Sequence, residues 1–123
     1  MPLQKDHIDK ARHNEQFCSS FDLNTTPFLD WVVNGIFYSA LHYVDSYFAS
    51  KNLHPGNRYN RNTLIKDDPN IGKSVYYLYR SLQDDSEEGR YRMKVFSSDE
   101  IQRDIIPLLN DIKTHLKRHV PEI

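Results

Sequence analysis

Four polar side chains that could take part in chemistry lie within a stretch that is otherwise mostly apolar or aromatic. They are Asn34, Tyr38, His42 and Asp45. On a helix, spacings of three and four place such side chains in one stripe along a single face. Two interpretations are open. Either the stripe is a buried hydrogen-bond network that fixes how helices pack, or His42 and Asp45 line a pocket in which the carboxylate orients or charges the imidazole.

Basic and aromatic residues from two separate parts of the chain form a second group of candidates. The group consists of His54, Arg58, Arg61, Arg90, Tyr91 and Arg92. Guanidinium groups offer paired N–H donors that suit phosphate, although a solvated surface position is the simpler interpretation of any one arginine. If the helices that flank residues 51–69 are antiparallel neighbours, Arg90 lies at the far end of the bundle from Arg58, unless the connection folds back along it.

Other kinds of site are disfavoured by the sequence. His115 and His119 are spaced to share a helix face and could bind zinc, but no third ligand is evident nearby, and Lys117 and Arg118 indicate a basic helix end instead. Cys18 has no catalytic motif around it and is expected in the core. There is no G-x-S-x-G, glycine-rich phosphate loop or HExxH motif. We therefore expect neither a metal nor a cofactor.

The elements that must position these residues are helices, because apolar side chains recur with helical spacing and no strand alternation competes. The most apolar helix is expected over residues 28–49, with Thr26 as its cap and Asp30 near its N-terminal dipole. A helix that is apolar on almost every face lies at the centre of its domain. Further helices are expected over residues 5–21, 60–66 and 70–88.

The last expected helix follows Ser97, which with Glu100 forms a capping-box pattern. Its apolar stripe runs to Leu116, and Pro107 should kink it. Gly89 is expected to cap the helix over residues 70–88. The predicted fold is therefore all-α, an up-and-down bundle of four long helices plus one short helix, in a single domain of residues 1–123.

Composition limits the class of protein. The chain has 123 residues, of which 38% are apolar and 27% charged, with no run of 18 apolar residues and no secretory signal. One cysteine excludes an internal disulfide framework and favours a cytoplasmic location. The net charge of −1 gives no evidence for a nucleic-acid partner, so RNA binding would require a local patch.

Several segments resemble one lineage of small bacterial and archaeal HEPN-domain proteins, over about residues 7–118. The segments are His7, Ala11, Asn14 and Phe17, then Trp31 with FYSALHYVDSYFA, then His54-Pro55 and Arg61, then LQDDSEEGRY. The resemblance implies a bundle of four to five helices that usually dimerises. Many HEPN proteins are metal-independent endoribonucleases in toxin–antitoxin or antiphage systems. Others bind nucleotides, pair with a small nucleotidyltransferase, or have no catalytic role.

The chain departs from the ribonuclease members at their catalytic motif, an arginine followed after four to six residues by a histidine. Arg12 and Arg118 each directly precede a histidine, and Arg103 precedes His115 by twelve positions. Members of the lineage also often have a second histidine where Arg58 stands.

If the chain cuts RNA, it must therefore use other residues. A histidine could take the proton from a ribose 2′-OH while an arginine stabilises the phosphate. The catalytic candidates are His42, His54, Arg61 and Arg90, and the ligand-binding candidates are Tyr38, Asp45, Arg58 and Tyr91. We expect a cytoplasmic, homodimeric HEPN-like protein that binds RNA or a nucleotide. The alternative is a non-catalytic protein-interaction subunit whose polar stripe is structural.

Overall fold

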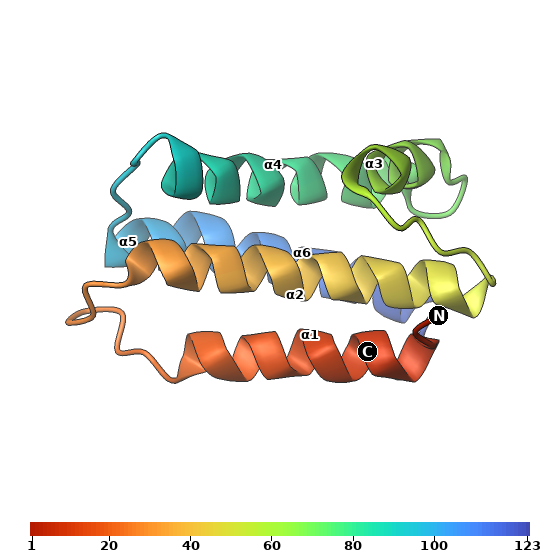
Figure 1. Ribbon diagram of the computed structural model, residues 1–123, viewed down its shortest axis with the longest axis horizontal. Coiled ribbons are helices and arrows are strands. Elements are labelled where there is room, and N and C mark those ends of the chain that lie inside the picture. Colours follow the sequence, from red (N-terminus) through yellow and green to blue (C-terminus); the bar gives the residue numbers. More distant parts are fainter.

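A long central helix with other helices packed around it forms the fold, as the computed structural model shows for all 123 residues (Figure 1). The elements are α1 (Gln4–Ser19), α2 (Leu29–Ser50), α3 (Arg58–Asp67), α4 (Gly72–Tyr91), α5 (Ser98–Glu100), the π-helical segment η1 (Ile101–Ile105) and α6 (Ile106–Lys117). The all-helical prediction is confirmed. The last expected helix is divided into three segments.

Helix α2 is the core of the bundle, as its apolar composition predicts. It buries 13 of its 22 residues, and it packs against α1, α4 and α6. In Figure 1 it lies between α1 and α4, with α6 behind it. Three tyrosines, Tyr43, Tyr47 and Tyr79, are almost completely buried in the shared core. No helix combines the length and apolarity that a bilayer crossing requires.

The helix boundaries agree with the sequence to within a few residues, but their caps differ in part. Thr26 Oγ1 accepts a hydrogen bond from the Phe28 N–H at 3.1 Å, although α2 begins only at Leu29 and its N-cap residue, Phe28, makes no side-chain cap. Ser97 is a cap, since its Oγ accepts from the Glu100 N–H at 3.0 Å. The Glu100 carboxylate, the second half of the expected capping box, accepts a hydrogen bond from Lys94 Nζ at 2.8 Å. It therefore pairs with a lysine side chain.

The prediction that Gly89 caps α4 is wrong. The helix continues to Tyr91, and Met93 adopts the left-handed backbone conformation, with a φ of 58°. Gly89 has a packing role, because a Cβ atom at this position would lie 2.8 Å from a ring carbon of Phe96. The side chain of Phe96 belongs to the buried core. Because Gly89 has no side chain, the segment that follows α4 can fold back and pack against the helix.

The expected kink at Pro107 takes the form of a π-helical segment. The Ile106 N–H donates to the Ile101 carbonyl, which is an i to i+5 bond. Helix α6 then begins at Ile106, so Pro107 lies in its first turn. Because α6 continues directly from η1, proline removes an N–H from an unbroken helical run, and the π-helical turn before it is a local change of the kind found at helix irregularities.

Asp68 fixes the turn that returns the chain from α3 into α4. Its buried carboxylate accepts hydrogen bonds from Tyr47 at 2.9 Å and Lys51 at 3.0 Å, and from the backbone N–H groups of Asn70 and Ile71. Burial alone would raise the pKa of Asp68, but these donors outweigh it and hold the pKa below its usual range. Residues from α2 thus hold the start of α4.

Gly35 allows the close approach of α1 to α2. A Cβ atom at this position would lie 2.5 Å from Cys18 Sγ and 3.2 Å from a ring carbon of Phe17. We predict that Gly35→Ala lowers the free energy of unfolding by about 1–3 kcal/mol, although alanine has the higher helix propensity. In a Cys18→Ala background the same change should be neutral or stabilising. Urea unfolding of the four proteins measures this coupling, and equal effects in both backgrounds would contradict the steric explanation.

Candidate functional site

Each residue of the polar stripe on α2 has a hydrogen-bond partner on another helix. The pairs are Asn34 with Ser86 at 2.8 Å, Tyr38 with Arg90 at 3.1 Å, His42 with His7 at 3.2 Å, and Asp45 with Arg61 at 2.8 and 3.0 Å. The partners belong to α1, α3 and α4. The stripe therefore ties α2 to three neighbours, as expected of polar groups on a buried helix.

Asp45 and Arg61 form a closed ion pair. The Nε and Nη2 atoms of Arg61 donate to the two carboxylate oxygens, and the side chains are only 8% (Asp45) and 11% (Arg61) exposed. A bidentate pair of this kind satisfies both charges. Of the candidates from the sequence, these two have the clearest structural role, because they anchor α3 to α2.

Helix α3 folds back along α4 and brings the two separate basic segments together. Arg58 forms a salt bridge with Glu87 of α4. A pocket of about 210 Å³ is lined by both parts of the chain, including Arg58 and Arg61 from one and Arg90 and Tyr91 from the other. The connection after α2 therefore does fold back along the bundle, which the sequence left open.

Arg90 differs from these arginines in having no carboxylate partner. Its Nη1 donates to Tyr38 Oη, and its Nε lies 3.4 Å from the Ser86 carbonyl oxygen. The guanidinium carbon lies 5.8 Å from the ring centre of Tyr38 and 5.0 Å from that of Tyr91, within the range of cation–π attraction. The side chain is thus held in place while its charge stays available to a ligand.

Arg90 also forms one wall of a larger groove of about 440 Å³ over the outer face of α2. The ten lining residues are Lys10, His13, Asn14, Phe17, Trp31, Asn34, Gly35, Tyr38, His42 and Arg90. None is acidic. Trp31 is 56% exposed, and Phe17 and Tyr38 are also exposed to solvent. The groove therefore combines positive charge with open aromatic surfaces, and its volume is typical of ligand sites.

His42 and His7 form an imidazole pair at the groove. Their Nδ1 atoms are 3.2 Å apart, and the rings are stacked at 5.4 Å between centroids. One Nδ1 must donate and the other accept, because two protonated Nδ1 atoms would repel each other. Burial lowers the pKa of both residues, and the mutual repulsion of their charges lowers that of His42 further. Both imidazoles are therefore held neutral, the form that can accept a proton.

Sequence reasoning missed Trp31 of the groove, and His7, the partner of His42, as site candidates. His7 lies 35 positions before His42 on another helix, so no local spacing relates the two. The exposure of Trp31 was equally hidden, since a tryptophan in an apolar helix is more readily assigned to the core. Both occur in the segments that resemble HEPN-domain proteins, which was the available signal.

His54 lies outside the groove. It lines a separate pocket beside α3, together with Leu53, Pro55 and Tyr59 among others. Its charge nevertheless contributes to lowering the pKa of His7, so it lies on the same side of the bundle. The structure thus brings Tyr38, His42 and Arg90 into one groove, but it does not bring His54 there.

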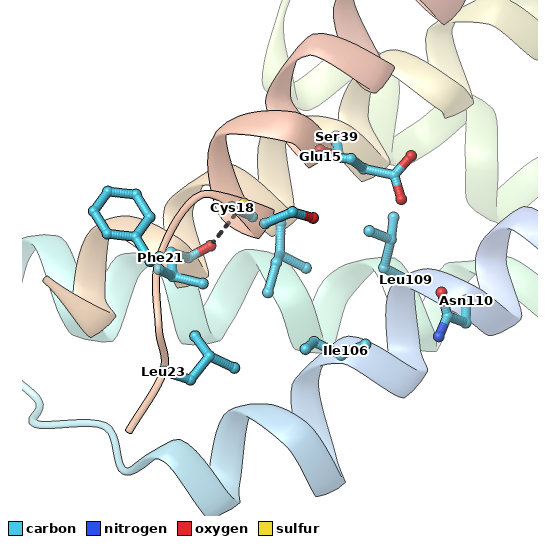
Figure 2. Close-up of a pocket in the computed structure, with 11 residues that line it drawn as sticks. Glu15, Cys18, Phe21, Leu23, Ser39, Ile106, Leu109 and Asn110 are labelled. Atoms are coloured by element: carbon cyan, nitrogen blue, oxygen red, sulfur yellow. Dashed lines mark hydrogen bonds between the residues drawn. The ribbon is translucent and has the colours of Figure 1, made fainter. Parts of the chain in front are cut away.

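A second, more apolar cavity lies between α1, α2 and α6 (Figure 2). Its volume is about 190 Å³, and seven of its 11 lining residues are hydrophobic. Cys18 lies in its wall and donates to the Val32 carbonyl oxygen at 3.4 Å. Burial raises the pKa of the thiol to about 11. Because the thiolate is the nucleophilic form, Cys18 has no activated nucleophile to offer at neutral pH.

No group of three or more histidine, cysteine, aspartate or glutamate side chains is arranged to hold a metal ion. The ring of His119 packs edge-on against Tyr47, at 5.6 Å between centroids.

Comparison of the chain with known protein families, curated proteins and solved structures found no match. The resemblance to HEPN-domain proteins therefore stays a prediction.

The two arginines that bond to the stripe should differ in their effect on stability. Arg61→Ala leaves the buried Asp45 carboxylate unpaired, and we predict a loss of about 3 kcal/mol in the free energy of unfolding. Arg90→Ala removes a contact at the solvent-exposed Tyr38, and should cost less than about 1 kcal/mol. Urea unfolding of both variants makes the comparison. Equal losses would mean that Arg90 is as structural as Arg61.

The histidine pair predicts that the protein loses stability on mild acidification. The folded-state pKa values of His7 and His42 lie below the unfolded value of about 6.5, so the unfolded chain binds protons that the native protein does not. Stability is therefore complete above the unfolded pKa and falls as the pH drops through it toward the folded pKa values. The melting temperature should decrease between about pH 7.5 and about pH 5.5, which lies above the usual range of carboxyl groups.

A His7→Gln/His42→Gln variant should show a smaller decrease over the same range, whereas His115→Gln should behave like the parent protein. Thermal unfolding followed by circular dichroism gives all three profiles. If the double variant loses as much as the parent, the acid sensitivity arises elsewhere.

Proposed function

We propose that this protein is a HEPN-like bundle that binds single-stranded RNA or a nucleotide in the groove over α2. The observation that carries the proposal is a set of unpaired basic groups in the groove, Lys10, His13 and Arg90, none of which takes part in a salt bridge. Elsewhere, Arg58, Arg61, Arg80 and Arg92 each have a carboxylate partner. Unpaired cations gathered beside aromatic side chains match the chemistry of a nucleotide.

Phosphate binding is supported by the way Arg90 is held. Its guanidinium lies near the rings of both Tyr38 and Tyr91 and donates a hydrogen bond to Tyr38 Oη. Less side-chain freedom is therefore lost when a phosphate binds, which favours affinity. The remaining N–H donors suit phosphate oxygens. Lys10 extends the positive charge along the α1 side of the groove, and His13 adds ring nitrogens that can hydrogen-bond to a ligand.

Base binding is supported by Trp31, Phe17 and Tyr38, whose exposed rings lie in the same groove. Proteins that bind single strands stack successive bases on such rings, and each base contributes about 1–3 kcal/mol. Bases in a duplex are stacked on one another and cannot do this. The proposal therefore specifies a single-stranded or mononucleotide ligand.

RNA cleavage would use the same groove. His42 is a neutral imidazole that can take a proton, and Arg90 is a cation that can stabilise a phosphate as charge develops. Such chemistry requires no metal. In this reaction His7 would orient His42. The gel assay with EDTA described below tests for the activity.

A second candidate function is protein binding, and a specific surface favours it. Tyr91, the last residue of α4, and Met93 and Val95, directly after the helix, are highly exposed. Exposed apolar side chains in a cluster are typical of interaction sites. The partner could be a second copy of this chain or a nucleotidyltransferase, as the HEPN resemblance implies. In this case the stripe on α2 would serve packing alone.

Binding can be tested by fluorescence anisotropy with a labelled single-stranded RNA oligomer. We predict that Arg90→Gln weakens binding at least about ten-fold, because it removes a preorganised phosphate contact. The matched control is Arg92→Gln, since Arg92 is exposed and paired with Glu88 outside the groove, and it should change affinity less than about two-fold. The slope of log affinity against log salt should also become shallower by about 0.7 in Arg90→Gln.

The same mixtures, incubated with EDTA and resolved on a gel, report cleavage. Products that form in the presence of EDTA and disappear in Arg90→Gln would make the protein a metal-independent ribonuclease. Binding without products would leave it an RNA-binding module. No binding at low salt, or equal losses in the two arginine variants, would reject the groove as an RNA site and favour the protein-binding candidate.

A further inference from the structure

Asn34 combines near-complete burial with an unused hydrogen-bond donor. It is 5% exposed and lies in the groove over α2. Its Oδ1 accepts from Ser86 Oγ at 2.8 Å, while its Nδ2 has no hydrogen-bond partner in the chain. Arg80 Nε is the one fully buried side-chain nitrogen or oxygen without a partner. The Nδ2 of Asn34 therefore keeps contact with solvent, and Asn34 lines the groove.

In the structure, the amide of Asn34 turns its oxygen toward Ser86. An asparagine side chain has an acceptor oxygen and a double-donor nitrogen, so its orientation determines which of the two is left for a ligand. Here the acceptor oxygen is bonded to α4, so the donor side is left for a ligand. Ser86 is itself completely buried, which protects this bond from competition by water. In this orientation the groove presents an N–H donor.

The aromatic residues on either side indicate what the donor meets. Trp31 lies three positions before Asn34 and Tyr38 four positions after it, so all three share one face of α2. Gly35, the next residue, also lines the groove, and Phe17 of α1 packs closely against it. A flat ring that stacks on Trp31 or Tyr38 would thus turn its edge toward the Nδ2 of Asn34. Arg90, bonded to Tyr38, stands beyond this position to take a phosphate.

We infer that Asn34 is the base-recognising residue of the groove, and that its Nδ2 donates to a carbonyl oxygen or ring nitrogen on the edge of a nucleobase. Ser86 is a positioning residue that holds the amide in this orientation. The inference rests on the proposed function, since it assigns the contact that a bound base makes. It adds that the groove recognises a base as well as a phosphate backbone.

Trp31 is the only tryptophan in the chain, so quenching of its fluorescence reports stacking of a base in the groove. The probes are single-stranded RNA hexamers of adenosine, uridine or cytidine, and an abasic ribose-phosphate hexamer with the same charge. Calorimetry measures the affinity of the abasic probe. The variants are Asn34→Leu, of similar size but without a donor, and Asn34→Asp, whose carboxylate can keep the bond from Ser86.

We expect Asn34→Leu to weaken binding of at least one base-containing hexamer about ten-fold, the size of effect that one hydrogen bond gives, and to leave abasic binding unchanged. Asn34→Asp should weaken the base-containing hexamers more than the abasic one. Ser86→Ala should weaken base binding less than Asn34→Leu, because it frees the amide without removing it. A purely structural role would weaken all probes alike.

The two levels of the proposal fail in different ways. Unchanged binding of every base-containing hexamer in both Asn34 variants would overturn base recognition and leave the groove as a phosphate site. Failure of the parent protein to bind any probe would overturn the groove itself. If Asn34→Leu does not fold, as judged by its melting temperature, the difference between base-containing and abasic probes in Asn34→Asp decides.

Discussion

A polar group on a buried helix has to be hydrogen-bonded, and the arrangement of helices around α2 depends on that requirement. Apolar packing is non-directional, so the buried side chains of α2 alone would allow neighbouring helices to slide or rotate. Hydrogen bonds from the stripe to His7, Ser86, Arg90 and Arg61 fix the position of α1, α4 and α3 in turn. Fully satisfied networks of this kind select one packing among several of similar apolar area. The site is therefore assembled by the same bonds that specify the fold.

The stripe changes character along α2, so a structural interpretation suits one end of it and leaves the other end open to a ligand. At Asp45 the partners are enclosed and mutually satisfied, as in a core network. At Tyr38 the partner Arg90 keeps its charge and both side chains contact solvent. Asn34 is intermediate, since its oxygen is bonded to α4 and its nitrogen is not. One row of residues can thus hold the helices together and still present unused donors on its open side.

The sequence is informative wherever the cause of a structure is local. Helical periodicity placed the helices, Ser97 was correctly identified as a cap, and the spacing of the α2 stripe predicted that its members share a face. It failed where a distant segment decides the outcome. A glycine at position 89 is typical of a helix cap, but here its lack of a side chain leaves room for the ring of Phe96. From the sequence alone, Arg61 could bind phosphate. In the structure α3 folds back toward α2, and Arg61 pairs with Asp45. Sequence spacing could not predict the pairing of His7, because its partner His42 lies on another helix.

The net charge illustrates the same limit in electrostatic terms. A total of −1 argues against an anionic ligand only if charge acts over the whole molecule. In salt, interactions between exposed charges fade over about 8–10 Å, so a ligand in the groove responds mainly to the residues that line it. Those residues include Lys10, His13 and Arg90 and no carboxylate. Acidic side chains elsewhere, such as Glu87 and Glu88, are neutralised by arginines beside them. A chain that is slightly acidic overall can therefore hold a groove that attracts phosphate, and the residues that line the groove indicate this where the sum of charges does not.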